Sequence, residues 1–242
     1  MSVSQSIQIR WIIWREVLNL LKKIENNQGI CFRTGKTQGS SSYQGIAIPD
    51  KETWQLAEAL CIAVSVTKSK GTTAGTRVDD IFGKFGPIRF DDWEGTHYLW
   101  SQTSVKGKNS ELGCRPDLTV TTSPETPSPD NIMRVIECKA ADNLETRVIR
   151  QEFGKAFDLK INSYLIWSLW KPQLRIVEGA NRLGLDVSSF EFDTERINDF
   201  VGVPGSLVEY VWQKIDESWR ARHFLEMIDR YIESHRNKWL GR

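Results

Sequence analysis

Cysteine, histidine and long apolar runs are all scarce in this sequence, and each shortage excludes a class of protein. The four cysteines are far apart and form no C-x-x-C pair, and none of the three histidines stands at a zinc-ligand spacing, so we expect no structural zinc site. No apolar stretch approaches the roughly 18 residues of a membrane span or resembles a signal-peptide core. We therefore predict a cytoplasmic protein without a membrane partner.

An excess of charge of one sign is also lacking. The 242 residues include 32 basic and 31 acidic side chains, a formal net charge of +1, so no overall field attracts the chain to nucleic acid or to acidic membranes. Any such attraction must be local. With 40% apolar and 26% charged residues, the composition is that of a globular protein long enough to bury a core.

A nucleotide-binding loop is missing as well. Gly35-Lys36-Thr37 has the ending of a phosphate-loop motif, but Ile30 stands where the motif requires its first glycine. A serine-rich segment, not the start of a helix, follows Thr37. We therefore expect no nucleotide cofactor.

The pattern of apolar residues divides the chain into three regions. Residues 1–95 predict a helical region with a basic loop, packed on the core. Residues 96–195 alternate strands with helices and form the expected core, and residues 196–242 predict closing helices that pack on the core, bind nucleic acid or form a dimer interface. The sequence thus predicts an α/β domain with helical N- and C-terminal additions.

The expected elements follow from apolar periodicity and from proline and glycine breaks. The helices are expected over residues 6–24, 50–66, 144–160, 173–184, 207–215 and 219–239, and the strands over 98–100, 118–122, 132–139, 164–170 and 185–192. A basic loop is expected over residues 67–86.

Two of these strands enclose a proline-rich connection. Three prolines lie within residues 124–130, between the strands at 118–122 and 132–139. Because proline cannot continue a ladder of backbone hydrogen bonds, this segment predicts a hairpin connection, or a longer loop, between adjacent antiparallel strands.

Asp117 begins the first of these strands, whereas Glu137 and Lys139 end the second. A register that sets Asp117 opposite Glu137 centres the turn on Pro127, the middle one of the three prolines. The two carboxylates then share one face with their Cβ atoms about 5 Å apart, and Lys139, two residues on, shares that face. All three side chains are expected at one edge of the sheet.

Two opposed carboxylates in a buried sheet repel one another unless a positive charge lies between them. Because the expected ligands are all oxygen atoms, we predict Mg²⁺, with Mn²⁺ as a substitute. Such an ion would polarise a phosphodiester and acidify a bound water, while Lys139 positions that water or balances the charge of the transition state. The predicted reaction is metal-assisted phosphodiester hydrolysis. In a purely structural interpretation, backbone amides satisfy Asp117, and Glu137 merely pairs with Lys139.

Pro116-Asp117, followed by Glu137-Cys138-Lys139 on the second hairpin strand and then by a helix and a buried strand, resembles the PD-(D/E)XK nuclease superfamily. The resemblance implies the restriction-endonuclease-like fold, a mixed β-sheet flanked by helices, and Mg²⁺-dependent cleavage of DNA. It also implies Asp117, Glu137 and Lys139 as catalytic residues, the two carboxylates being metal ligands. Many members add a glutamate from an upstream helix, and Glu58 is the candidate here because it lies on the inner stripe of its helix.

Some members of this superfamily carry a glutamine on the following helix, often as Q-x-x-x-Y. Here Gln151 is followed four residues later by Lys155 instead of tyrosine. On a helical wheel Gln151 lies opposite Ile149 and Phe153, whereas Glu152 lies nearer the side that faces the sheet. The exonuclease-type subgroup is therefore not indicated.

We accordingly predict a DNA endonuclease of the restriction or defence type. Because cutting both strands of a duplex requires two active sites, we expect a homodimer. Several basic residues are expected to contact DNA phosphates, or else to belong to solvated loops: Lys68, Lys70, Arg77, Lys84, Lys106, Lys108 and Arg115. The alternative function is that of a catalytically silent nuclease-fold subunit that binds nucleic acid or assembles a larger complex.

Overall fold

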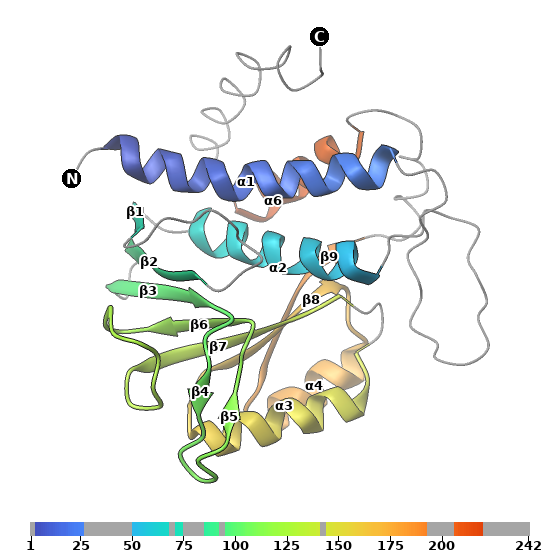
Figure 1. Ribbon diagram of the computed structural model, residues 1–242. Coiled ribbons are helices and arrows are strands. Elements are labelled where there is room, and N and C mark those ends of the chain that lie inside the picture. The colour runs from blue at the N-terminus through green and yellow to red at the C-terminus, as the bar shows by residue number, and fades with distance from the viewer. Residues whose placement is uncertain are drawn as a thin grey trace.

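A mixed β-sheet lies between two layers of helices in the computed structural model (Figure 1). This arrangement confirms the predicted α/β class and the predicted mixed sheet. The structure describes residues 3–26, 50–67, 71–74, 85–91, 95–140, 144–192 and 206–219.

The pairing of neighbouring strands changes from antiparallel to parallel at β7. Within the described residues it has seven strands in the order β1 (Gly71–Ala74), β2 (Phe85–Asp91), β3 (Thr96–Ser101), β6 (Leu118–Thr121), β7 (Ile132–Lys139), β8 (Tyr164–Trp170) and β9 (Asp186–Phe192). The pairs from β1 to β7 are antiparallel, whereas β8 and β9 continue the sheet in parallel with β7. A separate hairpin, β4 (Val105–Lys106) and β5 (Gly113–Cys114), stands beside the sheet near α3 (Figure 1).

Helices cover both faces of the sheet (Figure 1). On one face lie α2 (Asp50–Thr67) and, above it, α1 (Val3–Asn26), which contacts α6 (Ser206–Trp219). On the other face lie α3 (Thr146–Leu159) and α4 (Leu174–Arg182). One hydrophobic cluster joins α1 and α2 to the sheet.

The alternation of side chains along β7 sends its residues into two different environments. Ile136 and Cys138 belong to the hydrophobic cluster with α2, whereas Val135 belongs to the cluster with α3. Because successive side chains point to opposite faces, Glu137 and Lys139 emerge on the α3 side. The end of β7 therefore carries an acidic and a basic residue toward one helix.

The expected basic loop over residues 67–86 was wrong in part. The strand Gly71–Ala74 and the start of Phe85–Asp91 lie within it and form one edge of the sheet. Gly86 and Pro87 interrupt the pattern of the second strand, which hid it in the sequence. The short β4–β5 hairpin was also not predicted, and the helix predicted over residues 219–239 lies outside the described residues.

The inner face of α3 differs from the predicted one. Apolar spacing predicts one buried side with Ile149, Phe153, Ala156 and Phe157; Ile149 and Ala156 are buried, but Phe153 and Phe157 are 37% and 66% exposed. Glu152, which the helical wheel places nearer the sheet, lies on the inner face with an exposed fraction of 1%. A buried carboxylate requires partners, and the ion pairs described below provide them.

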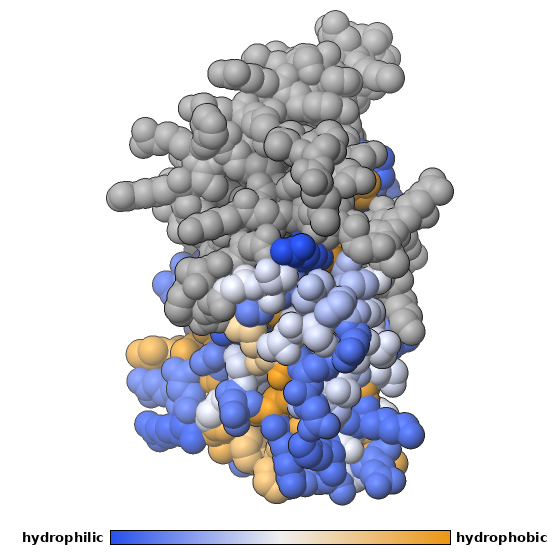
Figure 2. Space-filling view, turned by 90° about the vertical axis from the view of Figure 1, so that its left-hand side faces the viewer, coloured by the Kyte–Doolittle hydropathy of each residue, from blue (hydrophilic) through white to orange (hydrophobic). Residues whose placement is uncertain are grey.

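None of the described helices is both long and apolar enough to cross a membrane. The face seen in Figure 2 mixes hydrophilic residues with separate hydrophobic patches.

Candidate active site

The hairpin of β6 and β7 has the register that the sequence predicted. Leu118 pairs with Ile136 and Thr119 pairs with Val135, so the next opposed positions toward the strand end are Asp117 and Glu137. A register shift between Val120 and Thr121 lies at the other end of the pairing, toward the proline-rich connection. The irregularity therefore leaves the carboxylate pair in place.

Asp117 is held by β7 itself. Its Oδ2 atom accepts a hydrogen bond of 2.8 Å from the backbone amide of Cys138, and its Oδ1 atom accepts a longer one of 3.4 Å from Gln102 Nε2. The contact with the Cys138 amide agrees with the purely structural interpretation, in which backbone amides donate hydrogen bonds to Asp117. It also fixes the carboxylate beside the end of β7.

Glu58 on α2 shares the hydrogen-bond donor Gln102 with Asp117. Its side chain is 1% exposed, and its Oε1 atom accepts a hydrogen bond of 2.6 Å from Gln102 Nε2. Oε2 is buried and accepts no hydrogen bond from any residue that the structure describes. Burial, and then the negative charge of Asp117, raises the pKa of Glu58 to about 8, so the carboxyl group is largely protonated at neutral pH. Glu58, the candidate for the upstream-helix glutamate that the resemblance implies, therefore lies beside Asp117.

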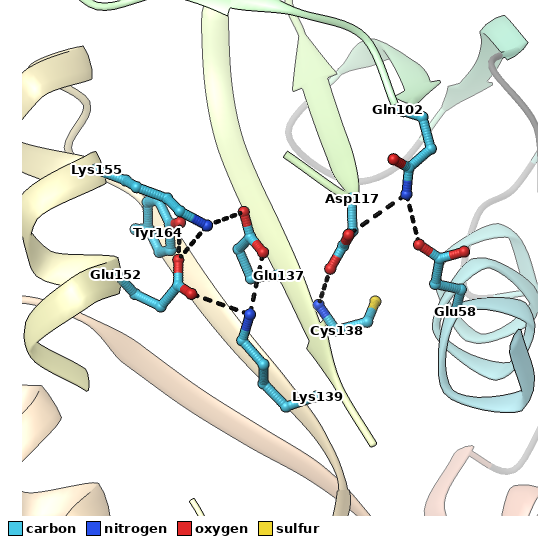
Figure 3. A network of polar contacts seen from close by, with 9 residues as sticks. All are labelled: Glu58, Gln102, Asp117, Glu137, Cys138, Lys139, Glu152, Lys155 and Tyr164. Carbon is cyan, nitrogen blue, oxygen red and sulfur yellow. Dashed lines mark hydrogen bonds and ion pairs between the residues drawn. The ribbon is translucent and has the colours of Figure 1, made fainter. Parts of the chain in front are cut away.

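Gln102 is a residue that the sequence did not indicate. It follows β3 with a φ of 50°, a left-handed conformation that is uncommon for residues other than glycine. Its backbone amide donates to the carbonyl of Asp117, and its side chain extends between Asp117 and Glu58 (Figure 3). Gln102 thus links β3, β6 and α2 at the site.

Glu137 belongs to a closed ring of four ion pairs. Lys139 Nζ lies 3.2 Å from Glu137 Oε2 and 3.0 Å from Glu152 Oε1. Lys155 Nζ lies 3.0 Å from Glu137 Oε1 and 2.9 Å from Glu152 Oε2. Each carboxylate therefore contacts both lysines, and each lysine contacts both carboxylates (Figure 3).

Tyr164 on β8 anchors this ring through Glu152. Its hydroxyl group donates a hydrogen bond of 2.6 Å to Glu152 Oε2. Burial alone would raise the pKa of Glu152, but the charge of Lys139 and the hydrogen bonds from Tyr164 and Lys155 hold that pKa below its ordinary value. Glu152 is consequently an ionised, fixed partner for both lysines.

The charges around Lys139 keep its ammonium group protonated. Burial lowers the pKa of Lys139, but the charges of Glu137 and Glu152 outweigh this effect and raise the pKa above its ordinary value. Burial and the charge of Asp117 raise the pKa of Glu137, against the opposing effect of Lys139 and Lys155. Lys139 stays protonated at neutral pH, so it suits charge stabilisation better than proton abstraction.

The three carboxyl groups converge on β7 but do not form a ready-made chelate. Glu137 points toward α3, whereas Asp117 points toward the Cys138 amide and Glu58 (Figure 3). Accordingly, no group of three or more His, Cys, Asp or Glu side chains among the described residues is arranged to hold a metal ion. The ligand chemistry nevertheless fits a hard cation, because the groups supply oxygen atoms and Glu58 Oε2 is buried with no hydrogen-bond donor among the described residues.

The predicted DNA-contacting residues have several different positions. Lys106 and Arg115 are exposed on the β4–β5 segment, and Arg115 immediately precedes Pro116 and Asp117. Lys108 forms an exposed ion pair of 2.7 Å with Asp130. The remaining candidates, Lys68, Lys70, Arg77 and Lys84, lie outside the described residues.

Sequence reasoning missed Lys155 and Tyr164 as members of the site. Lys155 lies three residues after Glu152, one turn along α3, and the position of Glu152 near the sheet-facing side was the available indication of this pair. Tyr164 belongs to an apolar strand and gave no indication of its own. Comparison with protein-family models, with curated proteins and with solved structures finds no match for this chain.

Proposed function

We propose that this protein is a Mg²⁺-dependent nuclease that hydrolyses phosphodiester bonds in DNA. One observation carries the proposal: Asp117 and Glu137 occupy opposed positions at the end of a hairpin, with Lys139 on the same strand and Glu58 facing Asp117. This combination agrees with the resemblance to the PD-(D/E)XK superfamily, whose restriction-endonuclease-like fold the chain would then share.

Asp117, Glu137 and Glu58 are the residues that would hold the metal. When bound, a divalent cation would polarise the phosphodiester and lower the pKa of a water ligand. Lys139 would stabilise the negative charge that develops on the phosphate, since its ammonium group stays protonated beside Glu137. Gln102 would orient Asp117 and Glu58 through its side-chain amide.

Phosphate-containing substrates suit this site because it combines carboxylates with two lysines at the end of a strand. In open α/β sheets, ligands bind outside the carboxyl ends of parallel strands, and β7 pairs in parallel with β8. That the phosphodiester belongs to DNA, and that the protein is an endonuclease of restriction or defence acting as a homodimer, rests on the resemblance and on the need to cut two strands.

A second candidate function has a specific observation in its favour. The ring around Glu137 and the proton on Glu58 balance the buried charges without a metal ion. A catalytically silent subunit that binds nucleic acid, or assembles a larger complex, would need no more than this.

Purified protein incubated with plasmid, linear duplex, single-stranded DNA and RNA tests the two functions. We expect cleavage of DNA with Mg²⁺ or Mn²⁺, none with EDTA, and a loss of at least about 100-fold in both Asp117→Asn and Lys139→Met. The exposed residue Glu178 supplies the control variant Glu178→Gln, which should cleave like the wild type. Binding of nucleic acid without cleavage under any of these conditions would support the silent subunit instead.

A further inference from the structure

Lys155 has the same contacts in the ring as Lys139. Each ammonium group lies within 3.2 Å of one oxygen of Glu137 and one oxygen of Glu152. The two lysines come from different elements, since Lys139 ends β7 and Lys155 lies in α3. The contacts alone therefore do not distinguish the lysine of the expected motif from the lysine on the helix.

The ring presents its cations, and not its anions, to the solvent. The side chains of Lys139 and Lys155 are 22% and 28% exposed, whereas those of Glu137 and Glu152 are 5% and 1% exposed. An anion that approaches the end of β7 therefore meets two ammonium groups before it meets the carboxylates.

Glu152 can retain both lysines when Glu137 changes partners. A cation bound by Glu137 competes with the lysines for its two oxygens, and each ammonium group then loses one acceptor. Glu152 keeps contact with both lysines and is itself fixed by Tyr164. The N–H groups released from Glu137 remain beside it, where they can donate to an anion that the cation also binds.

We propose that Lys155 is a second phosphate-binding residue of this site, held by Glu152 so that it contacts the nucleic-acid backbone beside Lys139. The inference rests on the proposed function in two respects, namely that Glu137 binds a divalent cation and that the ligand is a phosphodiester. It assigns α3 a direct part in binding the substrate, in addition to packing against the sheet.

The test compares Lys155→Met with Arg150→Met. Arg150 lies on the exposed side of the same helix, so its replacement removes the same charge without touching the ring. The first measurement is the affinity for a short labelled DNA duplex in Ca²⁺, and the second is the calorimetric affinity for Mn²⁺ without DNA. We expect Lys155→Met to weaken duplex binding about tenfold more than Arg150→Met does, since it removes a charge-assisted hydrogen bond. Its Mn²⁺ affinity should not fall, because the lysine competes with the cation for Glu137.

Two results would overturn the inference. One is a loss of duplex affinity in Lys155→Met that is no greater than in Arg150→Met. The other is a loss of Mn²⁺ affinity in Lys155→Met as large as its loss of duplex affinity, which would indicate a damaged ring. If Lys155→Met does not fold, the double variant Glu152→Gln/Lys155→Met removes one charge of each sign and should show the same weaker duplex binding.

Cleavage assays on the same proteins separate this inference from the proposed function. A wild-type protein that cleaves no substrate contradicts the nuclease proposal, and the duplex affinities still decide the role of Lys155. A wild-type protein that cleaves DNA, with Lys155→Met and Arg150→Met equally active and equally tight in binding, overturns only the inference. A wild-type protein that binds no duplex overturns the inference, and it overturns the nuclease proposal as well if it cleaves no DNA.

Discussion

Glu58 on α2 and Asp117 at the start of β6 meet beside the end of β7, where the charge of Asp117 helps to raise the pKa of Glu58 to about 8. Gln102 donates its side-chain amide to both carboxyl groups. This contact connects the N-terminal helices to the hairpin that carries the other candidate residues. It also makes the site sensitive to pH.

Replacement of Glu58 by glutamine should change how stability depends on pH. Between its ordinary pKa of 4.5 and about 8, Glu58 keeps a proton in the folded protein that the unfolded chain has released. The stability of the wild type therefore falls as the pH rises through this window. Glu58→Gln should be more stable than the wild type at pH 9, by a few kcal/mol, and similar to it below pH 4.5. Urea denaturation at several pH values measures this, and a difference that does not vary with pH would contradict it.

Removal of the Gln102 amide should weaken the binding of a divalent cation. Gln102→Leu keeps the approximate size of the side chain but no longer orients Asp117 and Glu58, so the Mn²⁺ affinity measured by calorimetry should fall several-fold. The matched control is Gln151→Leu, at an exposed glutamine of α3. Equal affinities in the two variants would show that Gln102 does not position the carboxylates.

The hydrogen bond between Tyr164 and Glu152 should contribute to stability as a coupled pair. Because it joins a buried hydroxyl group to an ionised carboxylate, we expect a coupling free energy of about 2 kcal/mol. A double-mutant cycle of Tyr164→Phe and Glu152→Gln, followed by urea denaturation, measures this value. Additive effects of the two replacements would mean that the contact contributes nothing of its own.

Metal removal should leave the protein folded. The lysines of the ring and the proton on Glu58 already balance the buried carboxylates, so EDTA should not change the melting temperature. Mn²⁺ at a hundred times its dissociation constant should add about 2.7 kcal/mol of stability to the wild type. Asp117→Asn should lack most of this gain. A wild type that melts earlier in EDTA would contradict the expected charge balance. An Asp117→Asn variant with the full gain from Mn²⁺ would contradict Asp117 as a metal ligand.

The sequence predicted the hairpin and its register because local rules determine both. Proline excludes residues 124–130 from the ladder, and a turn centred on Pro127 gives the register that sets Asp117 opposite Glu137. The burial of Glu58 could likewise be predicted from the sequence, since helical spacing places this residue on the inner face of α2.

The ring of ion pairs was not predictable from the same rules. Apolar spacing puts Phe153 on the side of Ile149 in α3, yet Phe153 is exposed, and Glu152, which the helical wheel placed only nearer the sheet, is fully buried. The buried position of Glu152 depends on contacts with Lys139, Lys155 and Tyr164, which come from three different elements. Tertiary contacts therefore override the local pattern here, and the same contacts supply the positive charge that a single lysine cannot.

An anomalous difference map from crystals soaked in Mn²⁺ tests the central claim most directly. We predict a peak coordinated by Asp117 and Glu137, with Glu58 beside it and with both lysines still in contact with Glu152. No peak at saturating Mn²⁺, or a peak elsewhere with the contacts of Glu137 to Lys139 and Lys155 unchanged, would contradict the proposed metal site.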